Sequence, residues 1–498
     1  MAFKPTLLPV AAAIMTLGLQ AQSAAQTDKD QKLSTVKVEA AEETSSNSVR
    51  ATETTIGKGR QALRDIPQSV TVLTERLIDD RNLDTVKEAL RNTAGVTFLA
   101  AEGGEEDVRL RGFSLQATGD LFVDGMRDPA IYDRDTFNLD RLEVLRGSAS
   151  MLFGRGSTGG AVNQVNKQPQ LWDSNQLDIT LGEHNYRRVV ADLNKRVGER
   201  SGLRVTAMNT QADNNGSGSA LDKHGIAATL GLGIGEQNEF EVSAYRLQNN
   251  NGVNYGMPFI PPVLGSTDRE LLPVDPASYF GLASDYNDSS ADIFTVGHTY
   301  RFSVNSELKT RIRQGHFERD LRSGAIRLNT TQPHGVGASL ETLSDATILT
   351  RGTHIKVQEM DNLHVQSDFS NKFKLHNMEH QLLAGADFSR EEKTVFAARN
   401  AAQGGVNITK PTTTVGTPND GAFVDEASRV LRVNNTYVST GFGAYIQDLV
   451  QVAPHWKLLG GLRYDSLKGD YQTYTLSATN PSGPVIPSDF YDMDVSEF

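Results

Sequence analysis

The sequence predicts a compact α+β domain followed by an antiparallel transmembrane β-barrel, and three observations point to this fold class. After the N-terminal segment, no apolar run reaches the ~20 residues that a membrane-spanning helix needs. From about residue 171, segments of ~10 residues alternate apolar with polar or small side chains, as transmembrane strands do. Residues 62–169 instead combine short strand, helix and turn signals. Only helices and closed barrels satisfy their backbone inside lipid, so we expect this chain to cross a membrane as a barrel.

The composition excludes several classes of protein. The chain has 498 residues and no cysteine, which rules out disulfide scaffolds, iron–sulfur clusters, cysteine nucleophiles and thiolate zinc sites. Its formal net charge of −12 argues against a nucleic-acid partner.

The first 61 residues are expected to serve export and attachment. Residues 1–25 have the pattern of a signal peptide, with Lys4, an apolar run and small residues before Gln26, although a short buried helix is the alternative. Residues 26–61 are polar and predict a tether. Within it, an alternating β-branched segment either adds to another protein's sheet edge or is a strand without a role. That segment is Leu33-Ser34-Thr35-Val36-Lys37-Val38-Glu39-Ala40.

Local signals define the α+β domain, residues 62–169. Residues 69–73 form a strand candidate, and Thr85 with Glu88 resembles a capping box. Val86, Ala89 and Leu90 share one face of the helix that follows, and Gly95 is expected to end it. Asp124-Gly125 predicts a tight hairpin turn.

The predicted barrel strands have one apolar and one polar face. Phe294, Val296, Tyr300 and Phe302 oppose Thr295, Gly297, Thr299 and Arg301, and Trp456, Leu458, Leu462 and Tyr464 oppose Lys457, Gly461, Arg463 and Asp465. A soluble sandwich would also alternate, but the charges and glycines of the polar face favour a wet lumen. The predicted connections also favour a barrel, because they differ in length. They are long near 249–290, 321–352 and 392–434, whereas the turn at 452–455 is tight.

Two motifs suggest other chemistry and are set aside. Residues 154–159 match G-x-G-x-x-G, but a strand rather than a helix is expected to follow, which disfavours nucleotide binding. Residues 376–380 match H-x-x-E-H, but they lie between two strand candidates and predict a hairpin turn rather than a metal site. No catalytic nucleophile or carboxylate pair stands out, so we expect no enzyme.

Several segments of the α+β domain occur in the order of a known family. They are Ile66–Val70, Ala89–Asn92 with Gly95–Val96, Arg111–Phe113, Phe122–Gly125, Glu143–Gly147 and Gly154–Gly160. On these segments the domain resembles the plug domain of TonB-dependent siderophore receptors. Glu102–Gly104 and Arg134–Asn138 are most similar to the catecholate branch. The alternating segment 33–40 stands where the family has its TonB box.

The resemblance implies import of a ferric siderophore across the outer membrane of a Gram-negative bacterium. TonB, working with ExbB and ExbD, would pull the TonB box and rearrange the plug, in contact with outer-membrane lipid. Iron would travel within the cargo, with no resident cofactor or metal. The alternatives are an importer of cobalamin, another metal chelate or an oligosaccharide, a passive porin, and a surface adhesin or phage receptor.

The family's barrels have 22 strands, whereas only about eleven or twelve strand candidates occur here. We therefore expect residues 170–498 to be the N-terminal part of a barrel and the chain to be a fragment.

The resemblance also suggests site residues. Arg127, Tyr132 and Arg134 at the plug apex, with Tyr255 and Phe259 from a loop, are expected to bind the ligand, because guanidinium groups and rings suit an anionic aromatic chelate. Arg111 and Arg146 match plug arginines that pair with glutamates of later barrel strands. We expect both to lack barrel carboxylates in this chain and to turn to plug acids such as Glu143, or to water.

Overall fold

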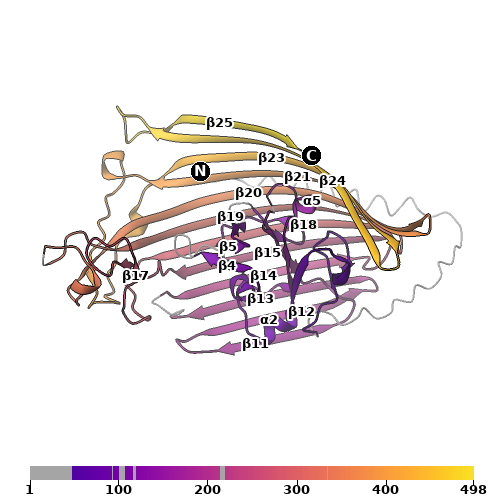
Figure 1. Ribbon diagram of the computed structural model, residues 1–498, viewed down its shortest axis with the longest axis horizontal. Coiled ribbons are helices and arrows are strands. Elements are labelled where there is room, and N and C mark those ends of the chain that lie inside the picture. The colour runs from indigo at the N-terminus through magenta and orange to yellow at the C-terminus, as the bar shows by residue number, and fades with distance from the viewer. Residues whose placement is uncertain are drawn as a thin grey trace. The chain divides into compact units, whose positions relative to one another are not determined.

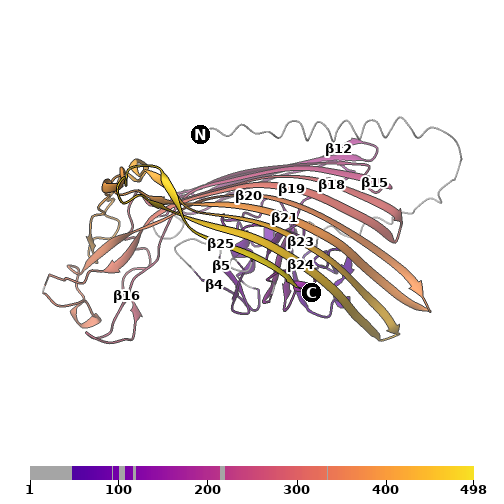
Figure 2. The same cartoon turned by 90° about the horizontal axis from the view of Figure 1, so that it is seen from above.

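The computed structural model describes residues 48–497 except 92, 100–106, 116–118, 157, 214–218 and 334, and all of these belong to one compact unit, Ser45–Phe498. The predicted signal peptide and TonB box lie outside the described residues. Among the described residues, no helix is long and apolar enough to span a membrane. A small α+β domain lies against a wide curved sheet (Figures 1 and 2).

The α+β domain contains a mixed five-stranded sheet in the order β3-β9-β10-β7-β8, in which only β10 and β7 run parallel. These strands are β3 Ser69–Thr74, β7 Leu121–Val123, β8 Met126–Arg127, β9 Leu139–Arg146 and β10 Gly160–Asn166. A second sheet joins β4 Val96–Leu99, β5 Asp107–Leu110 and β6 Phe113–Ser114. The helices within the described residues of this domain are η1 Leu63–Asp65, α2 Glu75–Asp80, α3 Val86–Leu90 and α5 Ser150–Phe153.

Local sequence explains these elements. The Thr85 hydroxyl accepts from Glu88 N at 3.2 Å and Glu88 Oε2 accepts from Thr85 N at 3.0 Å, which confirms the capping box of α3. The predicted apolar face of α3 is fully buried in the domain core. Asp124 and Gly125 both have positive φ and form the predicted turn between β7 and β8. The glycine-rich segment leads into strand β10, as expected.

The domain begins earlier than predicted. β1 Glu53–Thr54 pairs with β2 Gln61–Ala62, and Ile56 between them is buried in the domain core. The predicted tether therefore does not extend to residue 61. The hairpin could not be predicted from the polar composition of this segment, because a single isoleucine gives no periodic pattern. We call residues 53–166 the plug.

The large sheet, called the wall below, is an antiparallel path of twelve strands within the described residues. They are β11 Ser174–Leu181, β12 Arg187–Gly198, β13 Ser201–Ala212, β14 Leu221–Leu232, β15 Asn238–Gly252, β18 Tyr286–Ser303, β19 Ser306–Leu328, β20 Ile348–Leu375, β21 Met378–Ala398, β23 Leu431–Ala453, β24 Trp456–Leu476 and β25 Val485–Glu497. β22 Thr413–Thr414 pairs with β20. Within the described residues, β11 and β25 end the path and do not pair with each other, so a closed barrel stays a prediction.

The two faces of the wall differ as the alternation predicts. Phe294 is 46% exposed while Thr295 beside it is 3% exposed, and Trp456 is 72% exposed while Arg463 is 9% exposed. Apolar side chains therefore face outward and polar ones face the plug, which is the reverse of a soluble sandwich.

Connections are short at one end of the wall and long at the other. Residues 376–377 form a two-residue turn with positive φ, which confirms the hairpin reading of the H-x-x-E-H segment. The long loops are 253–285, 329–347 and 399–430, shorter than predicted because the flanking strands continue into them. At the end of β19 both faces are covered, since Leu321, Arg322, Ala325 and Ile326 are all buried, so the alternation that marks a strand is lost there. The loops contain β16 Phe259–Ile260, β17 Glu270–Leu271, η2 Leu340–Thr342, η3 Ala401–Gln403 and η4 Glu426–Ser428.

Candidate functional site: the contact between plug and wall

The plug is tied to β12 by a buried ion-pair cluster. Arg188 on β12 donates two hydrogen bonds to the carboxylate of Asp135, at 2.6 and 3.0 Å, and lies 3.3 Å from Asp84. The Tyr186 hydroxyl also donates to Asp84. Arg188 and Asp135 are both buried. A bidentate pair of this kind fixes position as well as charge.

A second buried cluster lies beside the first. Lys167, which follows β10, contacts Glu75 at 2.7 Å and Asp192 of β12 at 2.9 Å, and Arg204 of β13 contacts Asp192 at 2.6 Å. Burial alone would lower the pKa of Lys167, but the two carboxylates raise it overall. The plug is therefore fixed to β12 and β13 by fully paired charges.

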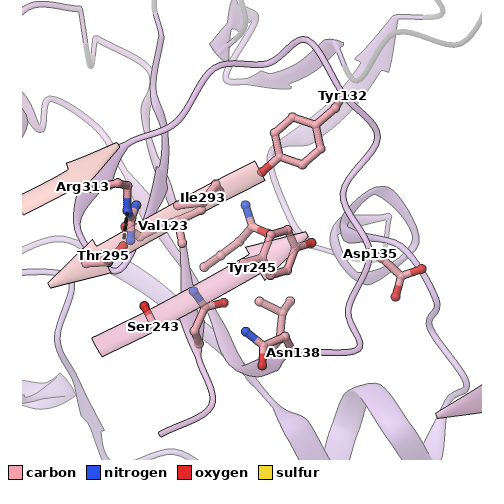
Figure 3. A pocket seen from close by; sticks show the side chains of 12 residues that line it. Val123, Tyr132, Asp135, Asn138, Ser243, Tyr245, Ile293, Thr295 and Arg313 are labelled. Carbon is pink, nitrogen blue, oxygen red and sulfur yellow. Dashed lines mark hydrogen bonds between the residues drawn. The ribbon is translucent and has the colours of Figure 1, made fainter. Parts of the chain in front are cut away.

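A small cavity remains between the plug and strands β15, β18 and β19 (Figure 3). Its volume is about 30 Å³, enough for roughly one water molecule and far below the ~300 Å³ of a small-molecule site. Arg313 closes it by donating to Val123 O at 2.8 Å and to the Thr295 hydroxyl at 3.2 Å. The plug thus seals this part of the wall without leaving room for a ligand.

The β20–β24 side combines a few polar contacts with an apolar cluster that includes Leu383 of β21 and Tyr445 of β23. Arg155 contacts Glu391 of β21 at 3.0 Å, and Lys457 of β24 contacts Asp65 at 2.8 Å. Lys58 reaches Tyr445 of β23.

The structure places two of the predicted ligand residues inside the plug–wall contact rather than at an open apex. Arg134 is buried, pairs with Asp128 at 2.6 Å and donates to Pro129 O at 2.7 Å. Tyr132 is also buried, donates to Asp128 at 2.8 Å and stacks on Phe317 of β19. Their positions give both a structural role, and ligand binding by either stays a prediction. Sequence alone does not reveal their burial, because Asp128 and Phe317 are identified as partners only in three dimensions.

Arg127 lies close to the wall but is occupied as well. Its guanidinium group donates to Phe153 O at 3.2 Å and Arg155 O at 2.8 Å, and it packs over the Phe122 ring. Burial, with the nearby charge of Arg155, lowers its pKa to about 10. Arg127 therefore holds the segment after α5 in place.

The two predicted loop residues lie in loop 253–285, separate from the three plug residues. Phe259 on β16 is 60% exposed, and the Tyr255 ring lies 5.2 Å from the His354 ring. Of the five predicted residues, Phe259 is the most available to a ligand arriving from outside.

Arg111 and Arg146 lie next to each other on the plug. Arg146 donates to Ala94 O at 2.6 Å and to the Thr71 hydroxyl at 2.9 Å. Burial and the charge of Arg111 lower the pKa of Arg146. Within the described residues neither arginine contacts a carboxylate, and their latch role stays a prediction. The suggested pairing with Glu143 is wrong, because Glu143 bonds Thr55, Arg141 and Asn163 instead.

Sequence reasoning missed a buried ionic network that joins the long loops. Lys410 lies 3.5 Å from Asp285 and 3.3 Å from Glu426, and Arg351 of β20 contacts Asp420 at 2.7 Å. Residues of the long loops and of the adjoining strands β19 and β20 also share an apolar cluster. Burial of a lysine in a predicted loop has no sequence signal, so only the structure reveals that the loops form one folded body.

The structure thus combines a folded plug with a wall whose polar side chains face the plug and whose apolar side chains face outward. Residues 62–161 match the family described as TonB-dependent Receptor Plug Domain, and residues 229–490 match TonB dependent receptor-like, beta-barrel. The second match covers more than half of the chain. The protein belongs to the TonB-dependent receptor family.

Curated relatives and solved structures agree with this family. The chain is 25% identical over 446 residues to the catecholate siderophore receptor Fiu of Escherichia coli O157:H7, covering 86% of this chain and 56% of Fiu. It is 25% identical over 475 residues to the probable TonB-dependent siderophore receptor PiuA of Acinetobacter baumannii, covering 91% and 61%. The chain spans about half the length of the curated relatives it matches. The closed-form crystal structure of the ferric-catecholate import receptor Fiu from E. coli K12 superposes with a TM-score of 0.78 at 20% identity, covering 90% of this chain and 65% of that one.

Proposed function

We propose that the protein imports a ferric siderophore of the catecholate class through the outer membrane of a Gram-negative bacterium, with energy supplied by TonB. The observation that carries the proposal is the plug, which is held by buried ion pairs against the polar face of the wall. A passage closed in this way needs an energy source to open, which disfavours a passive porin. Iron enters as part of the cargo, and the protein acts as a transporter rather than an enzyme.

The outward face supports a place in the membrane. On β18 the outward residues from Phe294 to Phe302 are apolar or aromatic except for His298, and Asp292 is the next outward residue toward the loops. Roughly ten residues separate Asp292 from Phe302, and at about 3.3 Å per residue and a tilt near 45° they rise about 23 Å. That height matches the ~25 Å apolar band of outer-membrane proteins.

The loop end of the wall is the proposed entry side. Asp292 is paired in register with His316 of β19, and β19 continues from His316 to Leu328 before loop 329–347 begins. The long loops would therefore stand outside the membrane, where Phe259 and Tyr255 could meet an aromatic ligand. The names of Fiu and PiuA favour a siderophore, and that of Fiu a catecholate.

A binding and uptake assay tests the substrate. Cells that produce the protein and lack other siderophore receptors are given ferric dihydroxybenzoate labelled with radioactive iron, with cobalamin as the competing alternative. We expect saturable binding and uptake that stops when TonB is deleted. Uptake that persists without TonB would indicate a porin, and saturable binding of cobalamin alone would indicate a different cargo.

The TonB box at residues 33–40 has its own test. A Val36→Pro substitution removes a backbone donor and distorts strand pairing with a partner. Ferric-siderophore binding should survive while uptake fails. Normal uptake in this variant would make residues 33–40 part of the tether only.

A further inference from the structure

A lysine and two carboxylates meet in a dry site where two of the long loops join. The Nζ atom of Lys410 lies 3.5 Å from Oδ1 of Asp285 and 3.3 Å from Oε1 of Glu426. The side chain of Lys410 is 1% exposed and those of the two acids are 2% exposed. They come from loops 253–285 and 399–430, which gather at one end of the wall (Figure 2). Segments far apart in the sequence therefore bring an amine against a carboxyl group, away from bulk water.

The contact between Lys410 and Asp285 lacks the geometry of an ordinary buried ion pair. An ammonium group carries three donors, yet neither Nζ of Lys410 nor Oδ1 of Asp285 has a hydrogen-bond partner within the described residues. Buried ionic groups normally form such bonds, because an unsatisfied charge in a dry site is costly. A covalent bond between the two groups removes both charges and this cost with them.

Backbone contacts hold the Asp285 carboxyl group in one orientation. Its Oδ2 atom accepts hydrogen bonds from the N–H groups of Leu282 and Gly324, both at 3.0 Å. Two N–H donors on one oxygen at this distance form the arrangement that stabilises the negative oxygen of a tetrahedral acyl intermediate. Oδ1, which faces Lys410, is then the oxygen that can depart.

Glu426 is placed to move protons between the two groups. Burial alone would raise its pKa, but the hydrogen bond from Arg429 and the charge of Lys410 lower the pKa overall, so Glu426 is ionised and can accept a proton. Arg351 donates to the carbonyl oxygen of Pro411 at 3.4 Å, directly after Lys410. Pro411 also restricts the backbone of Lys410 to extended conformations. The reacting groups are thus positioned in advance, which is what a slow condensation needs.

We infer that Lys410 and Asp285 join spontaneously in an isopeptide bond that ties loop 399–430 to loop 253–285. Glu426 relays a proton from the Lys410 ammonium group to Oδ1 of Asp285, which gives an amine and a neutral carboxyl group. Nζ then attacks Cγ, and the negative charge that forms on Oδ2 is stabilised by the two N–H groups. Glu426 carries a second proton from Nζ to Oδ1, which departs as water. An ammonium and a carboxylate thereby give an amide and one water, and no other reactant is needed.

The bond changes how the loop end of the wall is held together. Strands β18, β19, β20 and β21 lie between the two joined residues, so the amide closes them into a covalent ring. Such a ring lowers the entropy of the unfolded chain and keeps the two loops together even when the surrounding contacts open. The inference is independent of the cargo, because it depends only on the fold of the loops.

The mass of peptides from the unsubstituted protein tests the bond. Full-length protein purified from outer membranes is digested, and the peptides that contain Lys410 and Asp285 are followed by mass spectrometry. We expect one joined species, lighter by one water than the two peptides together, in about tenfold excess or more over the separate peptides. Separate peptides without the joined species overturn the inference, and so does a bond from Lys410 to Glu426 in place of Asp285.

Lys167 is the matched control in the same digest. It is also buried and contacts two carboxylates, Glu75 at 2.7 Å and Asp192 at 2.9 Å. However, Lys167 Nζ donates a hydrogen bond to Asp192, and Arg204 rather than a pair of backbone N–H groups holds that carboxylate. The peptide with Lys167 should therefore be found unjoined. Joining at Lys167 to the same extent as at Lys410 overturns the assigned geometry.

Two substitutions assign the roles of the side chains. Lys410→Met removes the nucleophile and should abolish the joined species. Glu426→Gln keeps the shape of the side chain but cannot relay a proton, so the joined fraction in freshly synthesised protein should fall about tenfold or more. A joined fraction that Glu426→Gln leaves unchanged overturns the proton relay. Since the unsubstituted protein decides whether the bond exists, the test stands even if a variant does not fold.

Discussion

The two sides of the plug are attached to the wall in different ways. Toward β12 and β13, Arg188 and Lys167 are buried and each contacts two carboxylates. Toward β20–β24, the polar contacts include Arg155 with Glu391, where Arg155 is 35% exposed, Lys457 with Asp65, and Lys58 with a single hydrogen bond to Tyr445. On the first side, buried cations are paired with carboxylates, whereas the second side has a partly exposed ion pair and a buried lysine with one hydrogen bond.

This difference separates contacts that are costly in free energy to break from contacts that can be broken at low cost. Breaking a buried pair leaves an uncompensated charge, which costs about 3–5 kcal/mol, while a partly exposed pair contributes about 0–1 kcal/mol. The proposed transport requires a plug that opens and recloses without being lost, and such a plug needs both kinds of contact. The predictions below break one side at a time.

The largest effect is expected at Arg188. Arg188→Ala leaves Asp135 buried without its bidentate partner, so the free energy of plug opening should fall by about 3–5 kcal/mol. Hydrogen exchange of the β9 and β10 amides measures this free energy.

The neighbouring Arg187 gives a matched control, because it lies on the same strand but is exposed and bonds only Gln211 within the described residues. Arg187→Ala should change plug opening by less than about 0.5 kcal/mol. Equal effects of the two substitutions would show that the β12 cluster does not anchor the plug.

The pH dependence of the hairpin should be the next largest effect. Burial lowers the pKa of Lys58 to about 8. The carboxylates of Asp368 and Asp387 oppose this shift, whereas the charges of Arg463 and Arg311 add to it. Withdrawn into water, the group has its ordinary pKa of 10.5. Between these values the withdrawn hairpin binds more protons, so raising the pH favours the inserted hairpin, by up to about tenfold per pH unit.

Hydrogen exchange at Thr55 N–H, corrected for the intrinsic rate, reports this equilibrium. Protection should be flat below about pH 7 and should rise from pH 8 toward 10. Lys58→Met removes the titration while keeping the apolar stem, so its corrected protection should not change with pH over this range. Protection that falls with rising pH in the unsubstituted protein would contradict the assigned burial.

How much of this could be read from the sequence depends on whether a feature is local. The alternation from Phe294 to Phe302, the Asp124-Gly125 turn and the hairpin at 376–377 depend on neighbours along the chain, and the structure confirms them. The pairing of Arg188 with Asp135 joins residues far apart in sequence, and no local sequence pattern predicts it. The Gly57-Lys58-Gly59 tip did carry a local turn signal, but polar surroundings made the tether the simpler prediction.

The smallest effect is expected at Arg155, on the weakly tied side. Arg155→Ala removes the 3.0 Å contact with Glu391, but water reaches the pair, and Glu391 keeps the Ser439 hydroxyl at 3.3 Å. Plug opening should therefore become easier by at most about 1 kcal/mol, several times less than in Arg188→Ala. Because the comparison is between two arginine–carboxylate pairs measured by the same amide exchange, it isolates burial as the variable. A loss at Arg155 as large as that at Arg188 would mean that the β20–β24 side holds the plug as firmly as β12 does.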